Sequence, residues 1–575
     1  MTLLLGPLLR HVDETSALVW VQTDGPGRVE VLGCSAATFE VAGSHYALVV
    51  VTGLEPDSRI PYQVHVDGQR CWPPEHSAFP PSTIPTRGPD RAGHARIVFG
   101  SCRYVKLADP KAARAYGLDA LDVYATRMAT QPPEQWPDVL LLLGDQVYAD
   151  ELTPQTRRRI AGRRDRHLRE HGSAADPVRD WPEDEIVGYD EYAGLYRDTW
   201  SDPEVRWMLS TVPTAMIFDD HDVRDDWNTS AAWRAEMAAT PWWRDRVRAG
   251  LASYWVYQHL GNLSPAELDA DHTWQRVRTA DGDVWPLLAT MADAADTETG
   301  DGAERHKEVR FSFCWELGRT RLVVIDSRNG RIVETLPRRM VSDSEFDWIA
   351  ARSLAPGADH LVLGTSIPWL MPQGISDAQA AVERIGNGDG VLARLAEKAR
   401  QGVDMEHWPA FGHSFARLAD LVRRVSRPHG GEPAPATVSV LSGDVHHGYA
   451  AVADVHAGPG TDTKVNQLTC SPVHNVVPLV MRVLFRATWS RLVARLSAPL
   501  AHGSGAEAAD VRWARTAGPL FGNLIATLET DGRRAAARFE TPRTASTLDP
   551  AAEVVLTEQA PAGFAGATPA PTEVR

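Results

Sequence analysis

The pattern of hydrophobic and polar residues changes once along the chain. In the first part the two kinds alternate, as at 17–22, 28–32 and 62–66, and turn-forming residues separate these segments. Alternation is typical of strands with one buried face, and short strands joined by regular turns favour a small β-sandwich. We therefore expect an all-β domain over residues 1–84, followed by a Pro-containing linker over 85–94.

After the linker, continuous apolar runs replace the alternation, and segments with helical spacing lie between them. Such runs are typical of strands buried on both faces, as in a parallel sheet covered by helices. We therefore predict an α/β domain over 95–545. Its predicted strands are 95–99, 139–143, 214–218, 309–313, 321–325, 360–364, 437–441, 521–529 and 535–540, and its predicted helices are 113–128, 346–354, 415–425 and 477–500.

Two stretches depart from this pattern. Residues 230–300 are helical in spacing, rich in Trp and acidic at their end, and we expect an insertion that can cover a site. Residues 546–575 are rich in Ala, Pro, Thr and Glu. Because that composition offers little apolar surface to bury, we expect a disordered tail.

Side chains that bind metals follow four of the predicted strands. The ends of neighbouring parallel strands meet at one edge of a sheet, where ligands of open α/β sheets bind. Each cluster alone also has a structural interpretation, as a cap, a turn or a small buried hydrophobe. Together they indicate a metal centre built mostly from hard oxygen donors. The four clusters are Cys102, Asp145 with Tyr148, Asp219-Asp220-His221, and Asp444 with His446.

Composition and charge narrow the function classes. The chain has 575 residues, and its 59 basic and 75 acidic residues give a net charge of −16. Nucleic-acid binding needs a basic face, so we expect no nucleic-acid partner. GxSxG, GxxxxGK[ST] and GxGxxG motifs are absent from the sequence. This argues against the common serine-hydrolase arrangement, a P-loop NTPase and a dinucleotide site.

The cysteines and the N-terminus bear on the compartment. The five cysteines lack CxxC spacing, which argues against a disulfide scaffold or a thiolate zinc site and fits a reducing compartment. The first residues carry neither a basic n-region nor a twin arginine. No apolar window reaches the roughly 18 residues that a spanning helix needs. We therefore expect a cytoplasmic protein.

At this point the motifs identify a known family. The segments 144–150, 219–222 and 442–446 resemble those of the metallophosphoesterase (calcineurin-like) superfamily, and specifically the PhoD-like alkaline phosphatases. Gly100-Ser-Cys102 is similar to the PhoD-like first motif, in which Cys replaces the usual Asp. The resemblance covers about 95–480. It implies a two-sheet sandwich flanked by helices, preceded by an immunoglobulin- or fibronectin-like β domain.

The resemblance also implies roles for single residues. Asp145 would bridge two metals, and His221 stands at the superfamily's catalytic His. Cys102, Tyr148 and His446 would complete a first site, which holds Fe³⁺ in the relatives. Asp220, where the motif has Asn, and Asp444, where it has His, would belong to the second site. The extra carboxylates favour Ca²⁺, Mn²⁺ or Mg²⁺ there.

The implied activity is hydrolysis of phosphomonoesters, phosphodiesters or both, on small-molecule substrates. Two metals would hold a bridging hydroxide for in-line attack. His221 would serve as general acid or as charge stabiliser. Arg103 and Arg224 flank the ligands, and either one can hold phosphate oxygens or form a structural ion pair.

Two alternatives stay open. One is a dedicated phosphodiesterase at a membrane surface, because an amphipathic 477–500 helix with four arginines can contact lipid. The other is a non-catalytic metal-binding or interaction protein on a hydrolase fold.

The sequence also departs from the family pattern. The twin arginine of secreted relatives is missing, which argues against phosphate scavenging outside the cell. The strand end at 364–369 has no His where the superfamily's fourth motif often supplies one, so the second metal would be held more weakly or by water.

Overall fold

The computed structural model describes residues 1–575 apart from 389, 403–404, 430, 457, 459–460, 491–492, 494–510, 545–553 and 565–575. The N-terminal region is all-β, as expected. One four-stranded sheet has the order β1-β2-β6-β5, another has the order β4-β3-β8-β9, and β10 pairs with β7. The bounds are β1 (Leu3–Val12), β2 (Ser16–Thr23), β3 (Arg28–Val31), β4 (Cys34–Ala37), β5 (Phe39–Val41), β6 (Ser44–Thr52), β7 (Arg59–Pro61), β8 (Val64–Val66), β9 (Gln69–Trp72) and β10 (Thr83–Pro85).

A six-stranded sheet of order β13-β12-β11-β23-β24-β25 carries the first three ligand clusters. β11, β12 and β13 run parallel, and β23 pairs antiparallel with β11. β12 is buried at every position, as its unbroken apolar sequence predicts. The bounds are β11 (His94–Gly100), β12 (Val139–Leu143), β13 (Thr214–Ile217), β23 (Ile525–Asp531), β24 (Arg534–Thr544) and β25 (Val554–Phe564).

A seven-stranded sheet of order β16-β17-β18-β19-β21-β20-β22 carries the fourth cluster. β17, β18, β19 and β21 are parallel, and the outer strands are antiparallel. The bounds are β16 (Phe313–Leu317), β17 (Thr320–Ile325), β18 (His360–Thr365), β19 (Thr437–Ser442), β20 (Gly448–Asp454), β21 (Lys464–Thr469) and β22 (Arg512–Leu520).

The two large sheets share one hydrophobic core. Leu141 and Leu143 of β12 belong to the same buried cluster as Val324 of β17 and Leu441 of β19. The sheets approach each other closely at Gly364, where an added Cβ would lie 3.4 Å from Leu143 Cδ2. The strand ends of both sheets therefore reach one region.

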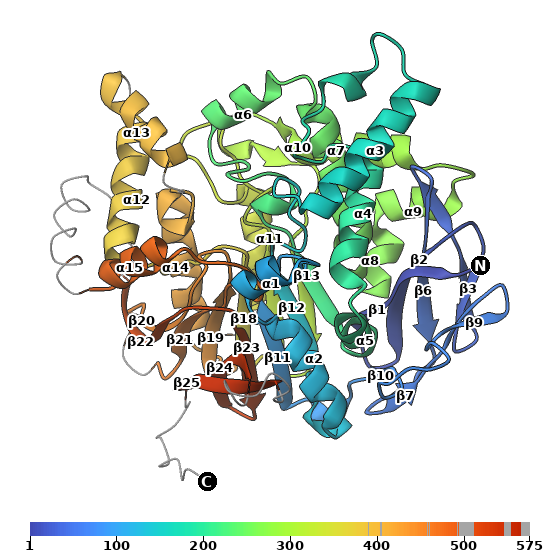
Figure 1. Ribbon diagram of the computed structural model, residues 1–575. Helices are drawn as coiled ribbons and strands as arrows, with labels where there is room; N and C mark the ends of the chain where they lie inside the picture. Colours follow the sequence, from blue (N-terminus) through green and yellow to red (C-terminus); the bar gives the residue numbers. More distant parts are fainter. Residues whose placement is uncertain are drawn as a thin grey trace.

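Helices cover both sides of this core. Figure 1 shows the N-terminal strands in blue on one flank, beside α5 and α8, and α12 and α13 on the opposite flank. The bounds are α1 (Pro110–Tyr116), α2 (Ala120–Thr130), α3 (Pro154–Glu170), α4 (Tyr189–Trp200), α5 (Pro203–Thr211), α6 (Ala231–Ala238), α7 (Trp243–Tyr257), α8 (Pro265–Ala270), α9 (His272–Thr279), α10 (Trp285–Asp296), α11 (Asp343–Leu354), α12 (Gln373–Gly386), α13 (Val391–Gly402), α14 (Gly412–Val425) and α15 (Leu479–Thr488).

Several predicted elements differ from those observed. The helix expected at 113–128 is split into α1 and α2, because Gly117 takes a positive φ and Asp119 caps the second helix. The strand expected at 309–313 begins at Phe313. α15 ends at Thr488, and most of the remainder of 477–500 lies outside the described residues.

The C-terminal tail also departs from expectation. Within 546–575, for which we expected disorder, β25 pairs antiparallel with β24. Val554 and Val555 begin this strand, and β-branched residues favour the extended backbone beside a paired edge. The flanking residues 546–553 and 565–575 lie outside the described part of the chain.

A candidate metal centre at the strand ends

Backbone hydrogen bonds join the turns that follow the central strands. Cys102 N donates to Gly144 O at 3.3 Å, and Arg103 N donates to Asp145 O at 3.2 Å, which links the turns after β11 and β12. Asp444 N donates to Ser101 Oγ at 3.0 Å, which brings the turn after β19 to the same place. The fold thus assembles the clusters that the sequence analysis placed at separate strand ends.

Four of the candidate ligands have left-handed backbone conformations. The φ angles are 56° at Cys102, 51° at Asp145, 65° at Asp444 and 50° at His446. Residues other than Gly seldom adopt this region, and each such position costs about 1–3 kcal/mol unless its surroundings impose it. Concentration of such strain at one place is characteristic of a functional site.

Asp222 fastens two of these turns together, a role that we did not predict from the sequence. Its Oδ2 accepts hydrogen bonds from the backbone amides of Asp145 and Asp219, both at 2.9 Å. Its Oδ1 accepts one from Val147 N at 3.3 Å. A single buried carboxylate therefore sets the spacing between the β12 and β13 turns. The acidic 219–228 stretch was the available signal, but sequence alone does not tell a backbone-binding Asp from a ligand.

Two overlapping groups of side chains have the geometry of a cation site. Ligand atoms of Asp145, Asp220 and His221 lie within 4.8 Å of one another, and so do those of Asp219, Asp220 and Asp444. Asp220 belongs to both groups. A third group within this distance, at α2 and the start of α5, consists of Asp122, Asp202 and Glu204, and Lys106 pairs with its two aspartates.

The buried carboxylates of the centre fit a bound cation. Asp145 Oδ1 and Asp219 Oδ2 are buried and have no hydrogen-bond partner. Burial raises the pKa of both Asp145 and Asp219 well above the ordinary value. Unpaired buried carboxylate oxygens are rare in folded proteins, and a metal ion would satisfy these two.

Cys102, Tyr148 and His446 adjoin the residues that carry the candidate carboxylates. Cys102 Sγ lies 3.7 Å from the backbone carbonyl oxygen of Asp444, the Tyr148 hydroxyl lies 3.5 Å from Asp145 Oδ2, and His446 N donates to Asp444 O at 2.6 Å. Burial raises the pKa of Cys102 and of Tyr148 and lowers that of His446 to about 4. His446 is therefore neutral at pH 7, the form in which imidazole binds a metal, and a metal would take the other two as anions.

Arg328, Glu406 and His407 belong to the centre but were not assigned to it from the sequence. Arg328 is fully buried, forms ion pairs with Asp219 and Glu406, and places Nη2 3.1 Å from Asp220 Oδ1. His407 Nε2 lies 3.0 Å from Asp444 Oδ2. Arg328 follows β17, so its strand-end position was a usable signal. Glu406 and His407 lie in a loop without any such pattern.

His221 is oriented by Asp150. The Nδ1 atom of His221 lies 3.0 Å from Asp150 Oδ1, and the imidazole ring lies 4.8 Å from the Tyr148 ring. When Nδ1 carries a proton, its N–H donates a hydrogen bond to the Asp150 carboxylate, which fixes the orientation of the ring and leaves Nε2 as the nitrogen that can act on a substrate.

The two flanking arginines are held in ion pairs. Arg103 is buried, pairs with Asp119 at 2.7 Å and donates to Thr199 O. Arg224 is partly exposed, lies 3.3 Å from Glu185 and stacks over Trp242. Both arginines therefore form the structural ion pairs that were one of their two expected roles. Phosphate binding by either arginine stays a prediction.

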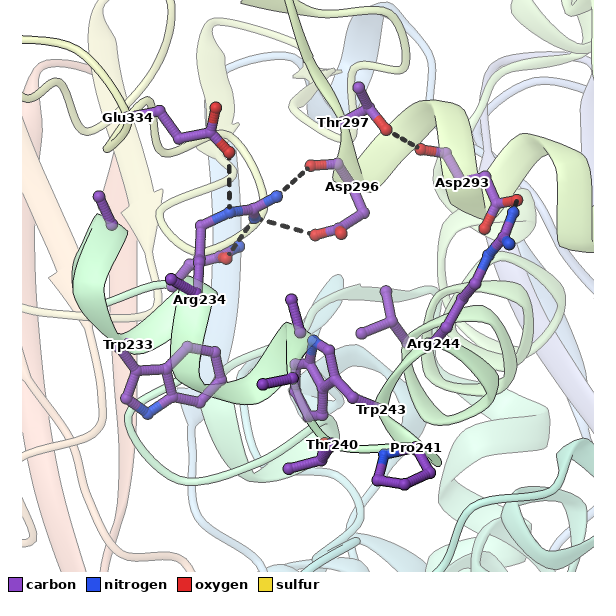
Figure 2. A pocket seen from close by; sticks show the side chains of 16 residues that line it. Trp233, Arg234, Thr240, Pro241, Trp243, Arg244, Asp293, Asp296, Thr297 and Glu334 are labelled. Carbon is purple, nitrogen blue, oxygen red and sulfur yellow. Dashed lines mark hydrogen bonds and ion pairs between the residues drawn. The ribbon is translucent and has the colours of Figure 1, made fainter. Parts of the chain in front are cut away.

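The Trp-rich insertion lines most of a partly open cavity of about 740 Å³ between α6, α7 and α10. Figure 2 shows Arg234 facing Asp296 and Glu334, Arg244 facing Asp293, and Trp233 and Trp243 along the wall. Each of these charged side chains already has an opposite partner. Asn228 also lines the cavity and donates from Nδ2 to Arg328 O at 3.3 Å, so the cavity and the candidate centre share a neighbouring residue.

Comparisons with known proteins agree with this geometry. The family model described as PhoD-like phosphatase matches residues 115–478. The chain belongs to the PhoD-like phosphatase family. Membership makes it a metal-dependent hydrolase of phosphate esters, and the two acidic groups are where such metals fit. A domain of unknown function, DUF7800, matches residues 1–84.

Among solved structures, this PhoD-like chain is similar to a structure of PhoD. The TM-score is 0.53 at 12% identity, and the match covers 96% of this chain and 88% of that one. At this identity the likeness concerns the fold. No curated protein matches the chain. A search of the described helices finds none with the length and apolar character needed to cross a membrane.

We predict that Gly144→Ala destabilises the protein by about 1–3 kcal/mol. Gly144 has φ +104°, and an added Cβ would lie 2.5 Å from Asp219 Cβ. Urea unfolding measures the change. Gly162→Ala is the matched control, because Gly162 lies in α3 with open space around it and Ala favours a helix. An equal or smaller loss in Gly144→Ala than in the control would contradict the close approach of the two turns.

Proposed function

We propose that this PhoD-like protein hydrolyses phosphomonoesters, phosphodiesters or both through a metal centre held by Cys102, Asp145, Tyr148, Asp220, Asp444 and His446. The observation that carries the proposal is the pair of acidic groups sharing Asp220, with unpaired buried carboxylate oxygens beside an oriented His221. Bound metals would supply Lewis-acid polarisation of the phosphoryl oxygens and activation of the attacking water.

The residues of the chain supply the rest of the mechanism. Asp150 orients the His221 ring, so that Nε2 can give a proton to the leaving oxygen or stabilise its charge. The buried guanidinium of Arg328 pairs with Asp219 and Asp220 and holds both carboxylates in place. Burial of the ligands excludes water and strengthens each of these interactions. The arrangement favours in-line displacement at phosphorus.

The donor chemistry supports two different metals. A thiolate and a phenolate at Cys102 and Tyr148 favour Fe³⁺, whereas an all-carboxylate set at Asp220 and Asp444 favours Ca²⁺, Mn²⁺ or Mg²⁺. We propose that the two large sheets form the sandwich that carries this centre. A non-catalytic metal-binding role is the second candidate, and turnover decides between them.

We predict that the metal-replete protein cleaves bis-p-nitrophenyl phosphate or p-nitrophenyl phosphate, and that His221→Asn lowers kcat about 10²–10⁴-fold. The reason is that the asparagine cannot transfer the proton at Nε2. His76→Asn is the matched control, because His76 is exposed in the N-terminal region. Absence of turnover for both esters across pH, with metal bound, would favour the non-catalytic candidate.

We predict further that removal of metal destabilises the fold. A ligand present at about 100 times its Kd stabilises the native state by about 2.7 kcal/mol, and chelation removes this term. The measurement is thermal unfolding with and without chelator, beside metal analysis. Asp145→Asn should abolish the chelator effect, since Asp145 Oδ1 loses its charge. A metal-dependent shift that persists in Asp145→Asn would place the metal elsewhere.

A further inference from the structure

β13 is the edge strand of the six-stranded sheet, yet it carries the turn with Asp219, Asp220 and His221. It pairs with β12 on one side. On its other side a side-chain amide takes the place of a neighbouring strand. Met216 N donates to Asn262 Oδ1 at 3.0 Å, and Asn262 Nδ2 donates to Met216 O at 2.6 Å. Asn262 thereby pairs with the free backbone N–H and C=O of Met216 at the edge of β13, three residues before Asp219.

Asn262 is itself held by Arg10, which lies on β1 in the N-terminal region. Arg10 Nη2 donates to Asn262 Oδ1 at 2.9 Å and to Gln258 O at 2.6 Å, and Nη1 donates to Tyr257 O at 3.1 Å. The last two acceptors are carbonyls at the C-terminal end of α7, which lack partners within the helix. A buried cation there is also favoured by the helix dipole.

A second route leads from the same turn to the centre. Gln258 Nε2 donates to Asp222 Oδ1 at 3.3 Å. Asp222 is the carboxylate that binds the amides of Asp145 and Asp219. Arg10 therefore acts on the 257–262 turn, and this turn reaches both the edge of β13 and the carboxylate that spaces the ligand turns.

The contact between Arg10 and this turn is built closely. Arg10 is about 1% exposed. A Cβ added at Gly261 would lie 2.3 Å from Arg10 Nε, so the turn admits the guanidinium only because Gly stands there. Burial without a carboxylate at hydrogen-bonding distance lowers the pKa of Arg10 to about 9, which leaves it charged at pH 7.

We infer that the N-terminal β region, which matches a domain of unknown function, serves to position the phosphoesterase centre. Two positioning residues act together in this role: Arg10 of the N-terminal region, and Asn262, which Arg10 binds beside β13. The effect on catalysis rests on the proposed function. The effect on the β13 turn does not, because it concerns backbone hydrogen bonds alone.

The test compares Arg10→Met with Arg206→Met in the full-length protein. Arg206, on α5, is the matched control because its side chain donates to Gly6 O of β1 at 2.7 Å and stacks over Trp72, so that it joins the same N-terminal strands to the second domain through contacts other than β13. Hydrogen exchange of the peptide 214–221 should rise about tenfold or more in Arg10→Met and in Asn262→Ala, and stay near wild type in Arg206→Met. The kcat should fall about tenfold or more in the first two variants, since small displacements of reacting groups are costly.

Double variants and the conservative substitution Arg10→Lys test whether Arg10 acts through Asn262. Arg10→Met and Asn262→Ala should be strongly non-additive in exchange, whereas Arg206→Met and Asn262→Ala should add. Arg10→Lys, which retains charge but reaches fewer acceptors, should fall between wild type and Arg10→Met. If Arg10→Met does not fold, the comparison of Arg10→Lys with Arg206→Lys decides. Equal exchange at 214–221 in the Arg10 and Arg206 variants overturns the inference. Absence of ester turnover in the wild type, with exchange as expected, overturns only the proposed function.

Discussion

The candidate centre depends on one constraint: several carboxylates must be held close together inside the protein, against their mutual repulsion and loss of water. Asp222 meets part of this constraint by binding backbone amides of two turns. Arg328 meets another part by pairing with Asp219 and Asp220. Burial still raises the pKa of Asp145 and Asp219 well above the ordinary value, so these contacts hold the carboxylates in place, and a bound cation would favour their charged form.

The same constraint explains the arrangement of the turns. Cys102, Asp145, Asp444 and His446 adopt left-handed conformations, which no ordinary strand end requires. This backbone is imposed by the hydrogen bonds that tie the turns to one another, such as Cys102 N to Gly144 O and Asp444 N to Ser101 Oγ. The strain is local, and the parallel strands behind the turns are buried and regular. A rigid sheet thus holds strained turns, which suits a site that must bind highly charged ions and substrate without rearranging.

Much of the fold was predictable, because continuous apolar runs identify buried strands. β12 matches its predicted bounds, and β11, β17, β18 and β19 differ from theirs by one residue at an end or at both ends. Strands without such runs were missed: β22, for instance, contains Arg512, Arg515 and Gly518. The ligand turns were found in the same way, because metal-binding side chains stand directly after these apolar runs in the sequence. It could not find Glu406 and His407, which reach the centre from a loop through tertiary packing alone.

Arg10 shows where sequence reasoning stops. It interrupts an apolar strand sequence, which is visible from the sequence alone, but its partners lie more than 200 positions away in the chain. Nothing local indicates that its guanidinium ends on α7, or that Asn262 completes the edge of β13. Edge strands need some cover for their free amides and carbonyls, and most proteins use another strand, a helix or charged side chains. Here one asparagine, held by an arginine from the N-terminal region, pairs with the free backbone groups of Met216. The order of the β13 turn, which carries candidate ligands, therefore depends on the packing between the two regions of the chain.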